Sequence, residues 1–436
     1  MLQIKPMVST IIVVLCFSTP IFGQSSLSLE EAIDLGLKKS EDLEKASLDI
    51  EKAEAQIREA WASAFPKLEA SVQSIRHFKS AVIQFGDQAI RVKQDWELLT
   101  GITLNQVLYT FGKVSTALDM AKMSRELNET VKDQVQREIR YAVEVSYYNV
   151  ILASKLLEIT KDSYQNAKNN QQALRKRFQG GRVPRFDNIK MAADVASRLP
   201  QVRSAEKNLR LAYLQLNLFT EMDKDARPTL TSKMSNNFSM IQNEDNLLKK
   251  TLEGPSLKIS DINVGLLDKQ AELKNADHYP SIGLFGSLNH GGTGNEMPVE
   301  EDRMFTSTAV GIAVTIPIYS GGETSAQYRQ AIIEKVKAKV NREKTKKDLS
   351  LSIESSLEEY KANKAKFDSA KEALRLATQA YKLTRTRFET GGATRYDLND
   401  SENALTGARM QVETTRFELH QNKSNIKRLT EKVVVK

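Results

Sequence analysis

The chain has 436 residues, of which 27% are charged and 7% aromatic, with one cysteine and a formal net charge of +8. A single cysteine excludes a disulfide scaffold and a cysteine-ligated metal site. Lysine and arginine alternate with glutamate and aspartate along helical stretches, which indicates solvated helix faces rather than a nucleic-acid-binding surface, so no nucleic-acid partner is expected.

Residues 1–23 have the features of a secretory signal peptide. An apolar run from Val8 to Phe17 is followed by Pro20 and the small Gly23, and this run is too short to cross a bilayer as a helix. Cleavage after Gly23 would release an exported chain without cysteine. Lipoprotein processing at Cys16 is the alternative, but the preceding Leu15 is not a small residue.

The rest of the chain contains one plan twice. The stretch "RFQGGRVPRFD" begins at Arg177, and "RFETGGATRYD" begins 210 residues later at Arg387. Two further pairs occur at spacings of 210 and 214: "GITLNQVLYTFG" with "GIAVTIPIYSGG", and "FPKLEASVQS" with "YPSIGLFGSL". Three matches at nearly one spacing indicate an internal duplication. We expect a first repeat over residues 24–221, a linker over 222–255 and a second repeat over 256–436.

Each repeat is predicted to begin with a helix, over about Leu29–Ala64 in the first copy and Ser256–Asp277 in the second. Two strands and a much longer helix follow, because Lys113–Phe178 and Glu323–Phe388 contain no Gly or Pro. Each of these segments has 66 residues, which extend about 100 Å as a helix. That length exceeds an ordinary globular helix.

Apolar residues recur every seven positions along both long segments. In the second segment they are Ile353, Tyr360, Phe367, Leu374, Tyr381 and Phe388. The same register in the first gives Val143, Val150, Leu157, Tyr164, Gln171 and Phe178. Such a stripe predicts a coiled-coil partner and left-handed winding. Burial of the stripe in a globular bundle is the alternative.

The two long helices are predicted to end at the repeated stretches. The pairs Gly180–Gly181 and Gly391–Gly392 provide positive-φ positions that stop a helix, and Pro184 or Thr394 then starts a return helix. The return helices are expected over about 185–221 and 394–432, with a kink at Pro200 in the first. Each repeated stretch is therefore the tip of an antiparallel helical hairpin.

The predicted strands alternate between apolar and polar residues, as outer-membrane strands do. Residues expected to face lipid in the second repeat are Ile282, Leu284, Ile312, Val314, Ile316 and Ile318. A soluble antiparallel sheet on a core would alternate in the same way.

A sheet in lipid must close, because an open edge leaves backbone groups unpaired. Four strands per chain cannot close alone, and eight strands from two chains would be filled by side chains. Three chains with twelve strands are the smallest open solution. The expected fold is therefore mainly α with membrane β: a long α-helical coiled-coil barrel joined to a trimeric 12-strand transmembrane β-barrel.

This plan resembles the TolC family of outer-membrane efflux proteins, through the duplication, "FPKLEAS", "YPSIGLFG", "GIAVTIPIYSGG" and the two tip stretches. The resemblance implies a homotrimer in outer-membrane lipid with a long periplasmic tunnel. It also implies a periplasmic adaptor (membrane fusion) protein and an inner-membrane pump of the RND, ABC or MFS type. The implied function is the passive exit duct of a tripartite efflux or type I secretion system. An exported soluble coiled-coil scaffold or adhesin is the alternative.

The resemblance also assigns residues at the tips. It implies that Asp397 and Asp400, three positions apart on one helix face, ring the channel entrance. Two solvated carboxylates favoured by the helix dipole are the alternative. Asp187 matches an acidic position that accepts a link in the closed state of the family. The family's Thr-Arg pair is absent, since Gly392 and Ala393 stand there, and Arg395 is the candidate substitute.

The same analogy places adaptor docking on six tip residues, for which helix-turn chemistry alone is the alternative. They are Arg177, Phe178, Gly181, Arg387, Phe388 and Gly391. No catalytic constellation is recognisable, and no two histidines lie three or four positions apart to form a helical metal pair. We therefore expect no enzymatic activity, cofactor or metal site.

Overall fold

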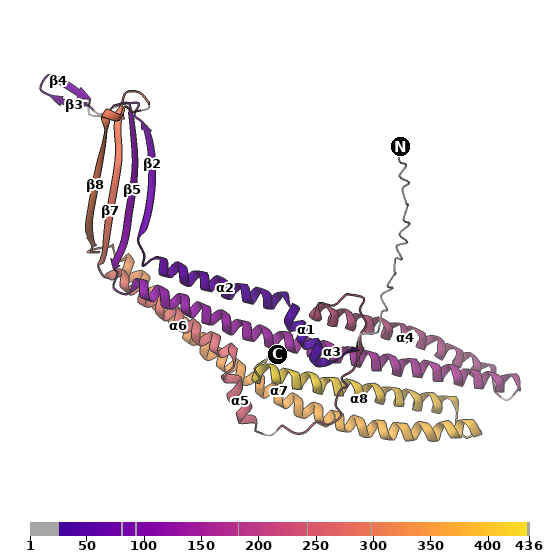
Figure 1. Ribbon diagram of the computed structural model, residues 1–436. Helices are drawn as coiled ribbons and strands as arrows, with labels where there is room; N and C mark the ends of the chain where they lie inside the picture. Colours follow the sequence, from indigo (N-terminus) through magenta and orange to yellow (C-terminus); the bar gives the residue numbers. More distant parts are fainter. Residues whose placement is uncertain are drawn as a thin grey trace, which may run out of the picture.

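The computed structural model describes residues 26–79, 82–91, 94–181, 183–241, 243–297 and 299–433. The predicted signal peptide lies outside the described residues. A four-stranded sheet stands at one end of a long layer of helices, and two helical hairpins form the other end (Figure 1).

The first half differs from expectation in two places. The first predicted helix is split at Ser40, whose extended backbone (ψ 122°) and side chain cap the second helix by accepting from the Leu43 amide. A short hairpin, β3–β4, lies between the two long strands and was not predicted. The elements are β1 (Ser26–Leu27), α1 (Leu29–Lys39), α2 (Glu41–Ala62), β2 (Lys67–Arg76), β3 (Val82–Phe85), β4 (Gln88–Arg91), β5 (Trp96–Tyr109), α3 (Lys113–Gln179) and α4 (Arg185–Thr220).

The second half repeats this order with shorter additions. The elements are β6 (Thr229–Leu230), α5 (Glu244–Leu252), α6 (Pro255–Asn275), the 3₁₀ turn η1 (Ala276–His278), β7 (Ser281–Gly294), the 3₁₀ turn η2 (Glu301–Arg303), β8 (Met304–Thr315), α7 (Glu323–Thr390) and α8 (Arg395–Thr430). The two long helices, α3 and α7, confirm the expectation from their lack of Gly and Pro. Helix α4 runs through Pro200 without a break.

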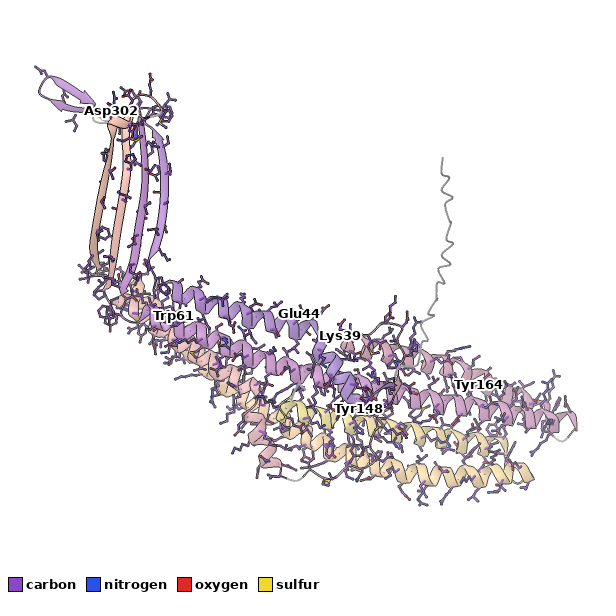
Figure 2. The ribbon with its side chains drawn as sticks, in the orientation of Figure 1. Lys39, Glu44, Trp61, Tyr148, Tyr164 and Asp302 are labelled. Carbon is purple, nitrogen blue, oxygen red and sulfur yellow. The ribbon has the colours of Figure 1, made fainter. Side chains whose placement is uncertain are left out.

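The strands of both halves build one antiparallel sheet in the order β2-β5-β7-β8. Hairpin β3–β4 projects beyond the end of this sheet that lies far from the helices (Figure 1). Asp302, between β7 and β8, is at the same end, whereas Tyr148 and Tyr164 lie along the helical layer (Figure 2).

The helices form a layer whose order changes along its length. Near the sheet, α2 packs on α3, α3 on α6 and α6 on α7; near the tips, α4 packs on α3, α3 on α8 and α8 on α7. The short helices cover the middle, where α1 contacts α3 and α4, and α5 contacts α7 and α8. Helix α5 therefore occupies in the second half the place of α1 in the first.

Three apolar clusters hold this layer together. The first joins α1, α3 and α4 around Tyr147, and the second joins α7 and α8 around Phe367 with Phe238 from the linker. The third lies between the tips of both hairpins and contains Leu174, Met191, Tyr381, Phe388, Leu398 and Leu405. The two hairpins thus share one core at their ends.

The seven-residue stripe is buried in the second half, except for the half-buried Leu374, and only partly buried in the first. Ile353, Tyr360 and Phe367 are buried, while Leu157 and Tyr164 of α3 are half-buried. In α3 the deeply buried series near the tip is instead Thr160, Ala167 and Leu174. Smaller side chains shifted by three positions therefore face the core of the first hairpin.

Candidate functional site

The register of the sheet places the expected lipid-facing residues of β7 and β8 on one face. Ile282 lies opposite Val314, and Leu284 lies opposite Ile312. Val314 and Ile312 are 56% and 66% exposed. Ile282 and Leu284 are half-buried, so the exposed part of this apolar face lies mainly on β8.

The other two expected lipid-facing residues lie outside the sheet. Strand β8 ends at Thr315, and Ile316 and Ile318 belong to the irregular segment before α7. The reason is Pro317, which has no amide hydrogen to donate to a strand ladder. Both isoleucines are exposed, Ile318 almost fully, so the apolar surface continues past the strand without strand pairing.

Aromatic side chains gather at both ends of the sheet. At the end far from the helices, the Arg76 guanidinium lies 5.2 Å from the Phe78 ring centroid and 5.3 Å from that of Trp96. At the other end the ring of Phe111 lies 4.7 Å from that of Tyr109 and 5.4 Å from that of Tyr279. These aromatic side chains lie at both ends of the sheet, whereas Phe285 lies within it.

The sheet has two open edges. Within the described residues, β2 pairs only with β5, and β8 pairs only with β7. All ten residues of β2 are exposed. The outward backbone groups of β2 and β8 therefore have no strand partner among the described residues.

At the opposite end of the molecule, Arg177 joins the tips of the two hairpins. Its guanidinium donates to the Phe388 carbonyl (3.2 Å) and the Glu389 carbonyl (3.1 Å) at the end of α7. It also lies 5.0 Å from the Phe388 ring centroid. The equivalent Arg387 donates instead to the Gly392 carbonyl in its own turn.

The two predicted entrance carboxylates have different environments. Asp397 forms a capping box with Thr394, whose amide and hydroxyl both donate to Oδ2 at 2.8 Å. These hydrogen bonds from Thr394 lower the pKa of Asp397. Asp400 is exposed and makes no hydrogen bond or ion pair with any residue that the structure describes. The Asp397 carboxylate therefore caps the start of α8, whereas the Asp400 carboxylate is accessible to solutes.

Arg395 and Asp187 meet across the two tips. The Arg395 Nε lies 3.5 Å from the Asp187 Oδ1, and the Arg395 guanidinium lies 4.1 Å from the Tyr396 ring centroid. The ion pair does not have hydrogen-bond geometry, because Nε and Nη2 of Arg395 are buried without a hydrogen-bond partner in the described chain. Arg395 thus contacts the acidic residue that the sequence suggested for it.

The six tip residues assigned by analogy to adaptor docking are not equally exposed. Phe388 is only 7% exposed, and Arg177 is occupied by carbonyl oxygens. Gly181 and Gly391 have positive φ (70° and 88°) and end their helices. The large exposed side chains at the tips are instead Phe186 (57%) and Tyr396 (60%), an equivalent pair that the repeated stretch already contained.

A buried polar network near the tips was missed in the sequence. Arg198 of α4 and Glu402 of α8 are 4% and 3% exposed, and both lie between the two hairpins. No periodicity or motif marks these residues, which are 204 positions apart.

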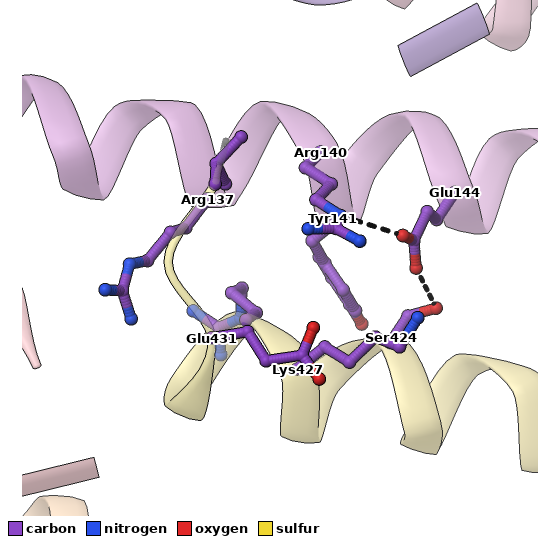
Figure 3. Close-up of a pocket in the computed structure, with 9 residues that line it drawn as sticks. Arg137, Arg140, Tyr141, Glu144, Ser424, Lys427 and Glu431 are labelled. Atoms are coloured by element: carbon purple, nitrogen blue, oxygen red, sulfur yellow. Dashed lines mark hydrogen bonds and ion pairs between the residues drawn. The ribbon is translucent and has the colours of Figure 1, made fainter. Parts of the chain in front are cut away.

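One pocket lies in the middle of the helical layer. A small pocket between α3 and the end of α8 is lined by paired charges, with Arg140 bound to Glu144 and Glu144 bound to Ser424 (Figure 3). No cluster of three potential metal ligands occurs among the described residues. None of the described helices is long and apolar enough to span a membrane.

Comparison with known proteins gives consistent matches. The chain is 22% identical to outer membrane protein TolC of Vibrio cholerae over 339 residues, covering 77% of this chain and 76% of TolC. It is 22% identical to the cobalt-zinc-cadmium resistance protein CzcC of Cupriavidus metallidurans over 418 residues, covering 94% and 92% of the two chains. The Campylobacter jejuni CmeC outer membrane channel has the same fold, with a TM-score of 0.79 at 18% identity over 92% of this chain and 85% of CmeC.

The family comparison covers both halves of the molecule. The model of the outer membrane efflux protein family matches residues 32–220 and again residues 249–430. Each match contains a pair of sheet strands and a complete helical hairpin. Because these two segments span most of the chain, the protein belongs to the outer membrane efflux protein family.

Proposed function

We propose that three copies of this outer-membrane channel protein form one duct, in which their sheets close into a twelve-strand barrel. The observation that carries this proposal is the pair of open sheet edges on β2 and β8. Because the four strands alternate in direction, β8 of one copy can pair antiparallel with β2 of the next. Closure removes the open edges that lipid does not tolerate.

The dimensions of the sheet fit a membrane barrel. Strand β5 has 14 residues, which extend about 45 Å along the strand and about 35 Å across a membrane at a tilt of ~40°. That distance matches a hydrocarbon core of about 30 Å with its interfaces. Trp96 and Tyr109, at the two ends of β5, would lie at the two interfaces, where aromatic belts are found.

The helical layer also has two edges that suit neighbouring copies. Helix α7 forms one edge, and α2 and α4 form the other. Both edges carry exposed apolar side chains, which include Ile333, Val336, Val340, Leu351, Leu376 and Leu383 on α7 and Leu48, Leu199, Leu211 and Leu218 on α2 and α4. Packing these edges together would bury apolar area and close the helices into a periplasmic tunnel.

The tips would form the tunnel entrance and the docking surface for a periplasmic adaptor protein, which delivers substrates from an inner-membrane pump. Phe186 and Tyr396 are the exposed aromatic anchors that such a helical partner would contact. We assign cargo selection to the pump, so the duct itself is passive.

The test of this function is extraction of the native outer membrane with mild detergent. We expect a particle with the mass of three chains that forms conducting channels in planar bilayers. A water-soluble monomer without conductance would instead support the exported scaffold or adhesin and contradict the duct.

The entrance carboxylates can be tested separately in the same channels. Because Asp400 is free and Asp397 is held in a capping box, Asp400→Asn should weaken block of the current by Mg²⁺ about tenfold. Asp397→Asn is the matched control and should change the block by less than about threefold. An unchanged block in Asp400→Asn would remove Asp400 from the entrance, whereas equal weakening by both substitutions would place both carboxylates there.

A further inference from the structure

The Arg198 network is the most extensive polar contact between the two hairpins. Five side chains from three helices surround the Arg198 guanidinium. It contacts Asp194 (3.2 Å), Asn399 (2.9 Å), Asn403 (3.2 Å), Glu402 (3.5 Å) and Ser163. Asn170 of α3 donates to the second oxygen of Glu402 at 3.4 Å. The network therefore links α3 and α4 of the first hairpin to α8 of the second.

This network has more hydrogen bonds than the Arg395–Asp187 contact at the tip. Arg198 is 4% exposed and uses its Nε, Nη1 and Nη2 atoms for hydrogen bonds. Arg395 instead has one ion pair of 3.5 Å and two buried nitrogens without hydrogen-bond partners among the described residues. A buried, fully bonded guanidinium is costly to separate from its carboxylates, so the tip contact would break first.

The partners of Arg198 on α8 flank Asp400. Asn399, Glu402 and Asn403 are within three residues of Asp400 and are held by Arg198 or its ligands, while Asp400 itself is exposed. Glu402 is buried beneath this turn of α8, whereas Asn403, three positions after Asp400 and on the same face, is exposed like Asp400.

We propose that Arg198 is a positioning residue for the channel entrance. It fixes the first two turns of α8 to the first hairpin, so that the Asp400 carboxylate keeps its place relative to α3 and α4. This inference rests on the proposed channel and on the entrance role of Asp400.

The charge of the network supports a role for the guanidinium. Burial raises the pKa of Glu402, and the positive charge of Arg198 opposes that shift. Removing Arg198 alone would leave Glu402 buried without its cation, and the variant would fold poorly. A test must therefore remove both charges together.

The test compares Arg198→Met/Glu402→Met with Asp133→Leu/Arg137→Met as the matched control. The control also removes a guanidinium–carboxylate pair, in which Arg137 is buried and Asp133 half-buried. That pair lies within α3 alone, at 3.3 Å and far from the tips in sequence. Each variant is isolated as the assembled channel. Mg²⁺ block and hydrogen exchange are then measured.

In Arg198→Met/Glu402→Met, we expect Mg²⁺ block to weaken by about tenfold, with exchange over residues 395–403 accelerated by about tenfold. The control variant should change neither the Mg²⁺ block nor the exchange over residues 395–403. Unchanged block and exchange in the Arg198 variant would overturn the proposal. Exchange accelerated evenly along the chain would also overturn it, because it would show a structural role only. If the wild-type protein forms no channels, the proposed function is refuted. If the wild type conducts, a change of Mg²⁺ block or exchange in the Arg198 variant tests the positioning role of Arg198 alone.

Discussion

The two halves of the molecule follow one plan but fill their cores differently. In the second half, aromatic side chains at Tyr360, Phe367 and Tyr381 face the hairpin core. In the first half, the small Ala167 does so near the tip, while Tyr147 fills the cluster beside α1. The two copies therefore share helix lengths and turn positions but differ in the side chains that fill their cores.

The covering helices also show what the duplication preserves. Helix α5 begins 215 residues after α1 (Glu244 and Leu29), and α6 begins 214 after α2 (Pro255 and Glu41). These spacings agree with the offset of 214 between "FPKLEASVQS" and "YPSIGLFGSL". We infer that the second repeat begins with α5, so that the linker proper ends near residue 243.

The largest expected effect tests the difference between the two cores. Phe367 is 2% exposed, whereas its equivalent, Leu157, is half-buried. Phe367→Ala should reduce the free energy of unfolding by about 3–5 kcal/mol. Leu157→Ala should cost less, about 1–2 kcal/mol. Denaturant unfolding of the assembled protein measures both, and equal losses would show that the two stripes are packed alike.

A second prediction concerns acid stability, to which His420 in the second half should contribute. This residue is 7% exposed, its ring centroid lies 4.4 Å from that of Tyr148 and 5.2 Å from that of Phe238, and Nε2 has no partner in the described chain. Burial lowers the pKa of His420 to about 4. The equivalent position in the first half is the exposed Arg210.

The lowered pKa of His420 means that stability falls as the pH falls. The unfolded chain binds a proton near pH 6.5, but the folded chain resists it until about pH 4, so acid favours unfolding across that window. Between pH 7 and 5, the free energy of unfolding of the wild type should fall by about 2 kcal/mol because of His420. His420→Leu should lose correspondingly less in thermal unfolding at the two pH values. An identical pH dependence in the variant would assign the acid sensitivity to other groups.

Most of the fold could be predicted because it depends on local patterns. Long segments without Gly or Pro predicted α3 and α7, and the alternation of apolar and polar residues predicted which residues of β7 and β8 share a face. The β3–β4 hairpin was also predictable, since Gly86 and Asp87 form a two-residue turn with φ +59° at the glycine. The break at Ser40 was harder, because serine is tolerated within a helix as well as at its cap.

The site was less predictable, because its contacts join distant parts of the chain. The capping role of Asp397 follows from Thr394 three residues earlier, a signal that is present in the sequence. The partners of Arg198 are up to 205 positions away and required the packed hairpins. Likewise, nothing local distinguishes Arg177, which reaches the other hairpin, from Arg387, which does not.

That last pair gives the smallest expected effect. Arg177 donates to the terminal carbonyls of α7 in the other hairpin, where a cation also offsets the helix dipole. Arg387 donates only within its own turn. Both contacts are partly solvated. Arg177→Met should therefore lower the free energy of unfolding by about 1–2 kcal/mol, and Arg387→Met should lower it by less than about 1 kcal/mol.

The location of the loss separates the two arginines more sharply than its size. If Arg177 joins the hairpins, Arg177→Met should accelerate hydrogen exchange at the tips of both halves, whereas Arg387→Met should affect only the turn at Gly391. Native-state exchange resolves such local opening even when global stability changes little. An effect of Arg177→Met confined to the first tip would mean that the shared apolar cluster of Leu174, Phe388 and Leu398 joins the hairpins without help from this arginine.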